Sequence, residues 1–371
     1  MNEDRYTEVE INSWGQRITN SFGGLILGVV LFLGSFIVLY WNEGRVDFSQ
    51  VAEQAIEVSA TSANNSVRGK FITTTGSIVS EELLGDNLFL NPGKYISINR
   101  TVEMFAWDER KTSKTQKNVG GSEKKVTTYD YSKEWTERPQ DSSKFKKSAE
   151  HHNPPKSIAD FTDRVSKATI GIYNLDMSKI NLPPNRELKL NEQNVTLKDS
   201  AILVGDRLFK GNGTPDDPQI GDIRLEYSVI PNGMNVTVFG KLSENNTITT
   251  YLHEGKHRFY RLLAGSKQEA IYRLNQEHTT FTWIFRLLGL GMMWLGLSLF
   301  IEPISVILDF VPFLGNLSRS VIGVSAFIIA FCLSSITILF SMLLHNLIAL
   351  LIAIFVAVAA GIVLRQLKHQ S

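Results

Sequence analysis

The chain contains 371 residues with a formal net charge of +1, and 43% of the residues are hydrophobic. A charge near zero offers no basic face, so we expect no nucleic-acid partner. Cys332 is the one cysteine, which excludes an intramolecular disulfide and a cysteine-built zinc site. The apolar residues are concentrated at Ser21–Trp41 and Thr282–Leu364. The polar stretch between them, at roughly 240 residues, is long enough for one large or two small domains.

The first apolar segment, residues 21–41, carries no charged side chain. At about 1.5 Å per residue it is long enough to cross a hydrocarbon core of ~30 Å, which predicts a transmembrane helix. The alternative is a signal peptide, but the segment is longer than a usual signal core and no small-residue cleavage site follows. Gly24 and Gly28 form a GxxxG pair, a helix-contact pattern that chance explains about as well.

A second span is predicted at residues 281–303, where Arg286 lies near the start and is expected to extend its charge to the interface. Glu302-Pro303 is expected to end this span. Residues 304–318 are apolar but too short to cross a membrane. They predict a helix or loop that lies at the membrane surface.

Two more spans are predicted at residues 320–342 and 345–364, with a tight turn at His345-Asn346. Small residues recur at every fourth position in both spans: Ala326, Ala330 and Ser334 in the third, and Ala349, Ala353, Ala357 and Gly361 in the fourth. Small residues allow helices to approach closely in lipid. We therefore expect the last two spans to form a packed hairpin.

Four spans place both ends of the chain on one side of the membrane. Arginine and lysine residues occur in the N-terminal arm (residues 1–20) and the short tail (residues 365–371), whereas the turn between the last two spans has none. The positive-inside rule then predicts that both termini are cytoplasmic and that the domain at residues 42–280 lies outside the cytoplasm.

The polar domain is expected to be rich in β-strands. Tyr95–Trp107 alternates, with one face made of Ile96, Ile98, Val102, Met104 and Ala106. Val126–Trp135 is a second aromatic-rich strand. The basic stretch between them, Asp108–Lys125, predicts the exposed tip of a long hairpin, as a solvated loop or, alternatively, a patch for phospholipid or a partner. A helix at Lys267–Glu277 is expected to lead into the second span.

Other strands are predicted at Val67–Val79, Ile170–Leu175, Val195–Val204, Ile220–Ile230, Met234–Phe239 and Thr247–Leu252. The predicted fold class is therefore an α+β membrane protein, with four transmembrane helices and a large β-rich extracytoplasmic domain inserted between the first and second spans.

One segment matches a catalytic pattern. His253, Glu254 and His257 read HExxH, in which a helix sets two zinc ligands one turn apart around a glutamate base. Here the pattern follows a β-branched run, and Gly255 disfavours a helix. The favoured interpretation is a strand leading into a turn, and a membrane-anchored zinc hydrolase is the alternative. The adjacent His151-His152 is expected to be solvated, and no cofactor is predicted.

Several segments resemble the transmembrane protein 43 (LUMA) family over nearly the whole chain. They are Ser13–Arg17, Trp41–Arg45, Val102–Trp107, Tyr129–Trp135, Ile220–Arg224, Thr282–Arg286 and Asp309–Pro312. The resemblance implies four spans around a large extracytoplasmic domain, and a role in membrane organisation and protein scaffolding without an established catalytic activity. HExxH is not a signature of the family. In a eukaryote, the resemblance implies the endoplasmic reticulum or inner nuclear membrane. A bacterial chain would have its domain in the periplasm.

The candidate site residues follow from these motifs. Those at the membrane interface are Trp14, Arg17, Trp41, Asn42, Glu43, Gly44, Arg45, Trp283 and Arg286, and those in the domain are Gly221, Asp222 and Arg224. Trp41 is expected at the headgroups and Gly44 at a turn. Glu43 and Arg45 are expected to meet headgroup charges or the start of the domain. We expect a non-enzymatic scaffold whose partners are the lipid bilayer and either other proteins or further copies of the chain.

Overall fold

The computed structural model describes residues 4–62, 64–118, 122–308, 312–346 and 351. The chain divides into two compact units. We call them the β unit, from residues 1–7, 48–112 and 128–275, and the helical unit, from residues 8–47, 113–127 and 276–371. Each unit is described separately below.

Eight strands form the larger sheet within the described residues, in the order β1-β5-β4-β12-β11-β10, with β6 paired to β4 and β9 to β12. Their bounds are β1 Arg5–Asn12, β4 Tyr95–Lys117, β5 Glu123–Thr136, β6 Phe161–Arg164, β9 Arg186–Glu187, β10 Ile202–Val204, β11 Arg207–Lys210 and β12 Ile223–Pro231. β12 runs antiparallel to β4, with Leu225 opposite Val102 and Val229 opposite Ile98. The predicted apolar face of β4 is confirmed, because all five of its residues are fully buried.

A seven-stranded sheet is formed in the described part of the β unit in the order β17-β13-β14-β8-β7-β3-β2, with β13 also paired to β3. The bounds are β2 Ile56–Glu57, β3 Phe71–Val79, β7 Ala168–Ile170, β8 Tyr173–Leu175, β13 Asn235–Leu242, β14 Thr247–Thr249 and β17 Arg261–Ala264. The strands β15 (Tyr251–His253) and β16 (His257–Phe259) pair separately. Buried side chains from both large sheets, such as Ile72, Val236, Ile96 and Leu225, belong to one apolar core.

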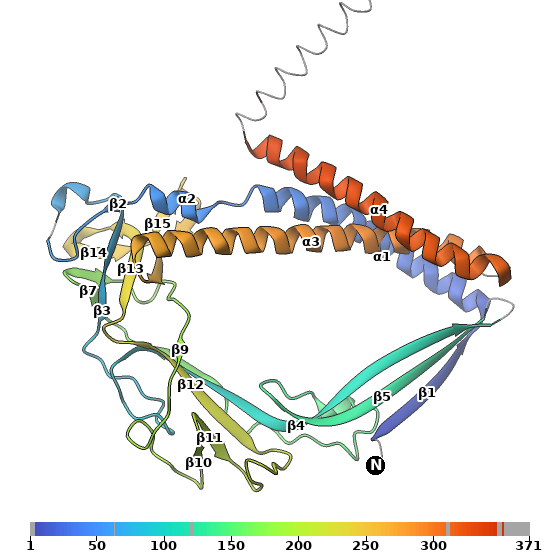
Figure 1. Ribbon diagram of the computed structural model, residues 1–371, viewed down its shortest axis with the longest axis horizontal. Coiled ribbons are helices and arrows are strands. Elements are labelled where there is room, and N and C mark those ends of the chain that lie inside the picture. Colours follow the sequence, from blue (N-terminus) through green and yellow to red (C-terminus); the bar gives the residue numbers. More distant parts are fainter. Residues whose placement is uncertain (1–3, 63, 119–121, 309–311, 347–350, 352–371) are drawn as a thin grey trace, which may run out of the picture. The chain divides into compact units, whose positions relative to one another are not determined.

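The hairpin of β4 and β5 is longer than the sequence predicts. Its strands extend to Lys117 and start again at Glu123, so most of the predicted loop at Asp108–Lys125 is strand (Figure 1). Apolar alternation does not reveal these arms, because both of their faces are polar. Cross-strand contacts such as Ser113 Oγ to Thr127 Oγ1 (3.1 Å) link them instead.

Strand β1 was not predicted. It pairs with β5, and in the β unit the amide of Tyr131 donates to the carbonyl of Asp4 (2.9 Å). In the helical unit, Lys125 of β5 lies 3.8 Å from Glu10 of β1. A strand of the N-terminal arm is thus paired directly with a strand of the polar domain.

The described helices are α1 (Trp14–Glu43), α2 (Phe48–Glu53), α3 (Lys267–Leu308) and α4 (Pro312–His345), with short 3-10 turns at Asn65–Val67, Ser142–Lys144 and Glu244–Asn246. Three helical stretches are long and apolar enough to cross a membrane: Trp14–Glu53, Lys267–Pro303 and Gly323–His345. They contain the first and second predicted spans and most of the third. The predicted fourth span at 345–364 lies outside the described residues apart from 345, 346 and 351.

Helix α3 does not end where the sequence predicts. It begins at Lys267, as expected for the helix that leads into the second span, but it continues through Pro303 to Leu308. Proline removes one backbone donor, and apolar helices tolerate that loss because the neighbouring backbone can adjust. The predicted surface helix at 304–318 is therefore divided between the end of α3 and the start of α4, with residues 309–311 outside the described part.

Within the helical unit, α1, α3 and α4 run side by side (Figure 1). α1 buries a seven-residue repeat of small or polar side chains, Ser21, Gly28, Ser35 and Asn42. At the centre the backbones of Gly28 and Gly296 approach so closely that a Cβ on Gly296 would lie 2.9 Å from the Gly28 carbonyl oxygen. Such contacts hold helices together where lipid supplies no hydrophobic force.

The small-residue stripe predicted for the third span is buried. Ala330 packs with Leu39 of α1 and Met293 of α3, and Ser334 Oγ lies 3.4 Å from Met293 Sδ. Within the described residues this stripe contacts α1 and α3, whereas the sequence predicted that it contacts the fourth span.

Candidate functional site: a cluster of the membrane-flanking motifs

The two motifs predicted at the membrane interface meet in the helical unit. Glu43, at the end of α1, accepts hydrogen bonds from Arg286 Nε (2.8 Å) and Nη2 (2.7 Å) of α3. The Glu43 side chain is only 5% exposed and that of Arg286 is 19% exposed. A two-pronged contact of this kind fixes orientation as well as charge, because the planar guanidinium matches the carboxylate.

Asn42 adds a second bond between the same helices. Its Nδ2 donates to the carbonyl of Thr282 (3.1 Å) and lies 3.2 Å from Glu43 Oε1. Asn42 is buried at the last position of the seven-residue repeat. The end of α1 is thereby joined to α3 through both a backbone and a side-chain partner.

Aromatic rings surround the two arginines. The Arg45 guanidinium carbon lies 5.8 Å from the Trp41 ring centroid, 5.6 Å from that of Phe281 and 5.5 Å from that of Phe285. Arg286 lies 5.0 Å from the Trp283 ring centroid. Contacts of this length are cation–π interactions, which gain strength as water is excluded. Arg45 thus contacts aromatic rings of α1 and α3. The sequence had left two other partners open for it, headgroup charges and the start of the domain.

The structure gives a steric reason for the glycine at position 44, which the sequence did not show. A Cβ at this position would overlap the imidazole of His345 at the end of α4. That imidazole also packs on Tyr40, with ring centroids 4.6 Å apart, and its Nδ1 contacts Ser341. We call Trp41, Asn42, Glu43, Gly44, Arg45, Trp283 and Arg286 the motif cluster. His345, Phe281 and Phe285 were missed, because spacing along the chain cannot reveal that the C-terminal ends of α1 and α4 meet beside the middle of α3.

Trp14 and Arg17 are not part of the motif cluster. They lie in the first turns of α1, at the opposite end of the helix. Trp14 Nε1 donates to the Val306 carbonyl of α3 (3.1 Å), and Arg17 Nε lies 3.3 Å from Glu123 Oε2 of β5. Arg17 is 7% exposed. Both residues therefore make contacts within the helical unit.

In the β unit, Asp222 holds a loop. Its carboxylate accepts hydrogen bonds from the backbone amides of Asn212 (2.8 Å), Gly213 (3.0 Å) and Gln219 (2.7 Å). A Cβ at Gly213 would come within 2.7 Å of Asp222 Oδ2. The aspartate and glycine together allow residues 211–219 to fold tightly against the start of β12.

The other two residues of this motif have similar structural roles. Gly221 has a φ of +97°, a conformation that favours glycine. Arg224 pairs with Glu103 across β12 and β4, and its guanidinium lies 4.7 Å from the Trp135 ring centroid. The motif therefore joins β12 to the hairpin of β4 and β5.

The HExxH segment is a β-hairpin. His253 of β15 lies opposite His257 of β16. Glu254 (φ 51°) and Gly255 (φ 69°) occupy the turn between them, and the Lys256 amide donates to the His253 carbonyl (3.1 Å). Positive φ at both central residues is typical of a type I′ turn. The zinc hydrolase alternative needs both histidines on one face of a helix, so the structure contradicts it.

His151 is buried, which corrects the prediction of a solvated pair. Its ring stacks on Tyr131 (centroids 3.9 Å apart, planes at 7°) and meets the Trp107 ring edge-on at 4.6 Å. Its Nδ1 contacts the Lys147 carbonyl (3.1 Å). The aromatic residues of β4 and β5 provide the hollow that takes this ring, whereas His152 is exposed as predicted.

A buried ionic group in the β unit was also missed. Asp86 accepts hydrogen bonds from the amides of residues 88–90 (3.0, 2.9 and 2.8 Å), and its other oxygen from Arg100 and the Tyr227 hydroxyl. Arg100 also donates to the Ala159 carbonyl (3.0 Å). The signal in the sequence was an arginine on the otherwise apolar face of Tyr95–Trp107. This group stabilises the core and is separate from the motif cluster.

Comparisons with known proteins agree with the resemblance. A family model described as transmembrane protein 43 matches residues 104–347. The chain is 26% identical to transmembrane protein 43 of Rattus norvegicus over 341 residues, covering 86% of this chain and 83% of the rat protein. It is 26% identical to the Homo sapiens protein over 344 residues, with the same coverage. The Drosophila melanogaster homolog is 24% identical over 286 residues, covering 74% of this chain and 75% of that protein. No solved structure matches the chain.

Proposed function

Because the chain belongs to the transmembrane protein 43 family, we propose that it is a non-enzymatic membrane protein that holds a β-rich binding region at a bilayer and organises protein or lipid partners there. The observation that carries this proposal is that the residues of the motif cluster contact one another between the helices. Its charged and aromatic groups bind one another and fix the C-terminal end of α1 to the middle of α3. They build a rigid membrane anchor.

The outer faces of the helices support a lipid or helix environment. Large apolar side chains exposed there include Phe22, Ile26, Val30, Leu33 and Ile37 of α1, Leu287, Leu295 and Phe300 of α3, and Val324, Ile328, Phe331 and Ile336 of α4. A continuous apolar surface of this kind is unfavourable in water. Lipid chains or further helices, including those of a second copy, would cover it.

The partner claim is tested by photo-crosslinking in native membranes. A photoreactive residue at Leu83 or Ile202, which are exposed apolar positions of the β unit (57% and 46%), is expected to capture the same protein in repeated experiments. The matched control is Ile26 on α1, where capture of lipid or of another membrane helix is expected. Recovery of an uncrosslinked monomer at both β-unit positions would contradict the scaffold role.

The membrane arrangement is also part of the proposal. Since β1 pairs with β5, we expect these strands to share one compartment, so that α1 inserts into the apolar layer without placing its two ends on opposite sides. This departs from the positive-inside expectation. Chemical labelling can check whether β1 and β5 lie on the same side of the membrane.

The labelling experiment uses single cysteines at Thr7 and Ser132, two exposed positions of β1 and β5, in a Cys332→Ser background. A membrane-impermeant maleimide is expected to label both cysteines from the same side of sealed vesicles, because the strands are hydrogen-bonded neighbours. Permeabilised vesicles provide the control for reactivity. Labelling of the two positions from opposite sides would refute the shared compartment.

A further inference from the structure

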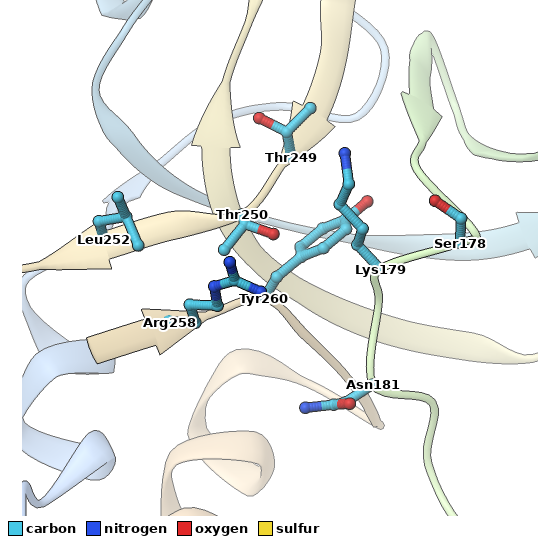
Figure 2. Close-up of a pocket in the computed structure, with 8 residues that line it drawn as sticks. All are labelled: Ser178, Lys179, Asn181, Thr249, Thr250, Leu252, Arg258 and Tyr260. Carbon is cyan, nitrogen blue, oxygen red and sulfur yellow. The ribbon is translucent and has the colours of Figure 1, made fainter. Parts of the chain in front are cut away.

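A pocket of about 690 Å³ opens in the β unit (Figure 2). Its walls come from the loop after β8, the link between β14 and β15, and the strand β16 with the residues that follow it. The hairpin formed by the HExxH segment brings Arg258 to the rim of this pocket, opposite Leu252 in the β15–β16 pairing. The volume lies within the range of small-molecule sites, about 300–1,000 Å³.

The lining is cationic. It includes Lys179 and Arg258 and contains no carboxylate. The structure shows no ion pair or hydrogen bond from the exposed Arg258 side chain to any residue in the part of the chain it describes. Lys179 pairs with Asp176 just outside the lining (3.0 Å). The net charge of Arg258, Lys179 and Asp176 together is therefore +1. An anion would pair with Arg258 and share Lys179 with Asp176.

Neutral donors complete the lining. Tyr260 is one of the lining residues, and its hydroxyl oxygen accepts a hydrogen bond from the Asp176 amide (2.8 Å). Burial raises the pKa of the Tyr260 hydroxyl, which therefore stays a donor at physiological pH. Thr250 and Asn181, whose side chains carry further hydrogen-bond donors, also belong to the lining residues. A cluster of donors with two cations is the chemistry that binds phosphate oxygens.

The loop that carries Lys179 is held in place. The amides of Lys179 and Ile180 both donate to the Asp176 carbonyl (3.2 Å each), and Arg164 donates to the carbonyls of Ser178 and Ile180 (3.4 Å each). A pocket whose loop is already fixed loses little freedom on binding. The site is thus formed before a ligand arrives.

We propose that this pocket binds the phosphate group of a phosphomonoester, with Arg258 as the main cation that contacts it and Lys179, Thr250, Asn181 and Tyr260 as further donors. Both a soluble metabolite and a lipid headgroup carry such a phosphate. The half-exposed Leu252 at the rim provides an apolar contact for the remainder of either ligand. This site is independent of the scaffold role, since neither needs the other.

The test is calorimetric titration of the full chain in detergent with inorganic phosphate, glycerol 3-phosphate and a short-chain phosphatidic acid. Arg258→Gln is expected to weaken binding about tenfold or more, the effect of losing a charged hydrogen-bond partner, and Lys179→Gln is expected to weaken it less. Lys256→Gln is the matched control, because Lys256 lies in the turn of the same hairpin but outside the pocket. It should change affinity less than about twofold.

The probes separate the two sources of phosphate. Equal affinity for glycerol 3-phosphate and phosphatidic acid, both lost in Arg258→Gln, identifies a soluble ester as sufficient, whereas binding of phosphatidic acid alone identifies a lipid headgroup. Binding of no probe would overturn the proposal. So would an equal loss in Lys256→Gln and Arg258→Gln, since that would show a general charge effect.

Discussion

Replacing Arg286 by methionine is expected to destabilise the helical unit by about 3–5 kcal/mol, because it leaves the buried Glu43 carboxylate without its cation. The loss should appear as a lower midpoint of unfolding in a denaturing-detergent titration followed by circular dichroism. Methionine keeps the length and apolar volume of the side chain, so lost packing contributes little. The effect is therefore expected to come from the unpaired charge.

A matched pair lies on the surface of the β unit. Arg207 and Glu226 are 3.1 Å apart but 46% and 38% exposed. Arg207→Met is expected to cost less than about 1 kcal/mol, since exposed pairs are screened by water. If Arg207→Met and Arg286→Met destabilise the chain equally, burial of the Glu43 pair does not matter and the account of the motif cluster fails.

Asp86→Ala is expected to produce the second large effect, about 3–5 kcal/mol of lost stability in the β unit. The substitution leaves Arg100 buried without its carboxylate and removes the acceptor of three backbone amides and the Tyr227 hydroxyl. Urea unfolding of the full chain in mild detergent, followed by tryptophan fluorescence, measures it. Asp141→Ala is the control, because Asp141 also accepts local hydrogen bonds but is exposed. It should cost about 1 kcal/mol or less.

The same carboxylate makes stability depend on pH in acid. Although burial alone would raise the pKa of Asp86, hydrogen bonds from Tyr227, the Leu90 amide and Arg100 hold it below the ordinary value of 3.8. A carboxyl with a lowered pKa in the folded state stabilises the fold fully above its ordinary pKa. That contribution is lost as the pH falls through the lowered value. Asp86→Asn should remove this part of the acid dependence, and an unchanged acid profile would contradict it.

Local patterns predicted much of the architecture correctly. The alternation in Tyr95–Trp107 identified the buried face of β4, and the length of uncharged apolar segments identified three helices. The long polar strands were not predicted, because β1 and the outer half of the β4–β5 hairpin place polar groups on both faces. Their stability comes from pairing with neighbouring strands, which a single segment does not reveal.

The candidate site shows the same division. Motif residues such as Glu43 and Arg286 were identified one by one, but their pairing across 243 positions of the chain was not. Glu43 and Arg45 were predicted to meet headgroup charges or the start of the domain, since the sequence gives no information on which helices meet. The HExxH match shows the converse, because a motif acts only in its own secondary structure, and Gly255 after a β-branched run already indicated a turn.

The central claim is that the family motifs on α1 and α3 act as one ionic pair holding the membrane anchor together. A charge swap tests it most directly, by comparing Glu43→Arg, Arg286→Glu and the double variant in the denaturing-detergent titration. Each single reversal places two like charges together and should destabilise the helical unit. The double variant should recover most of the loss, since it restores the pair and places a cation at the C-terminus of α1, where the helix dipole favours it. A double variant no more stable than the worse single one would contradict the claim.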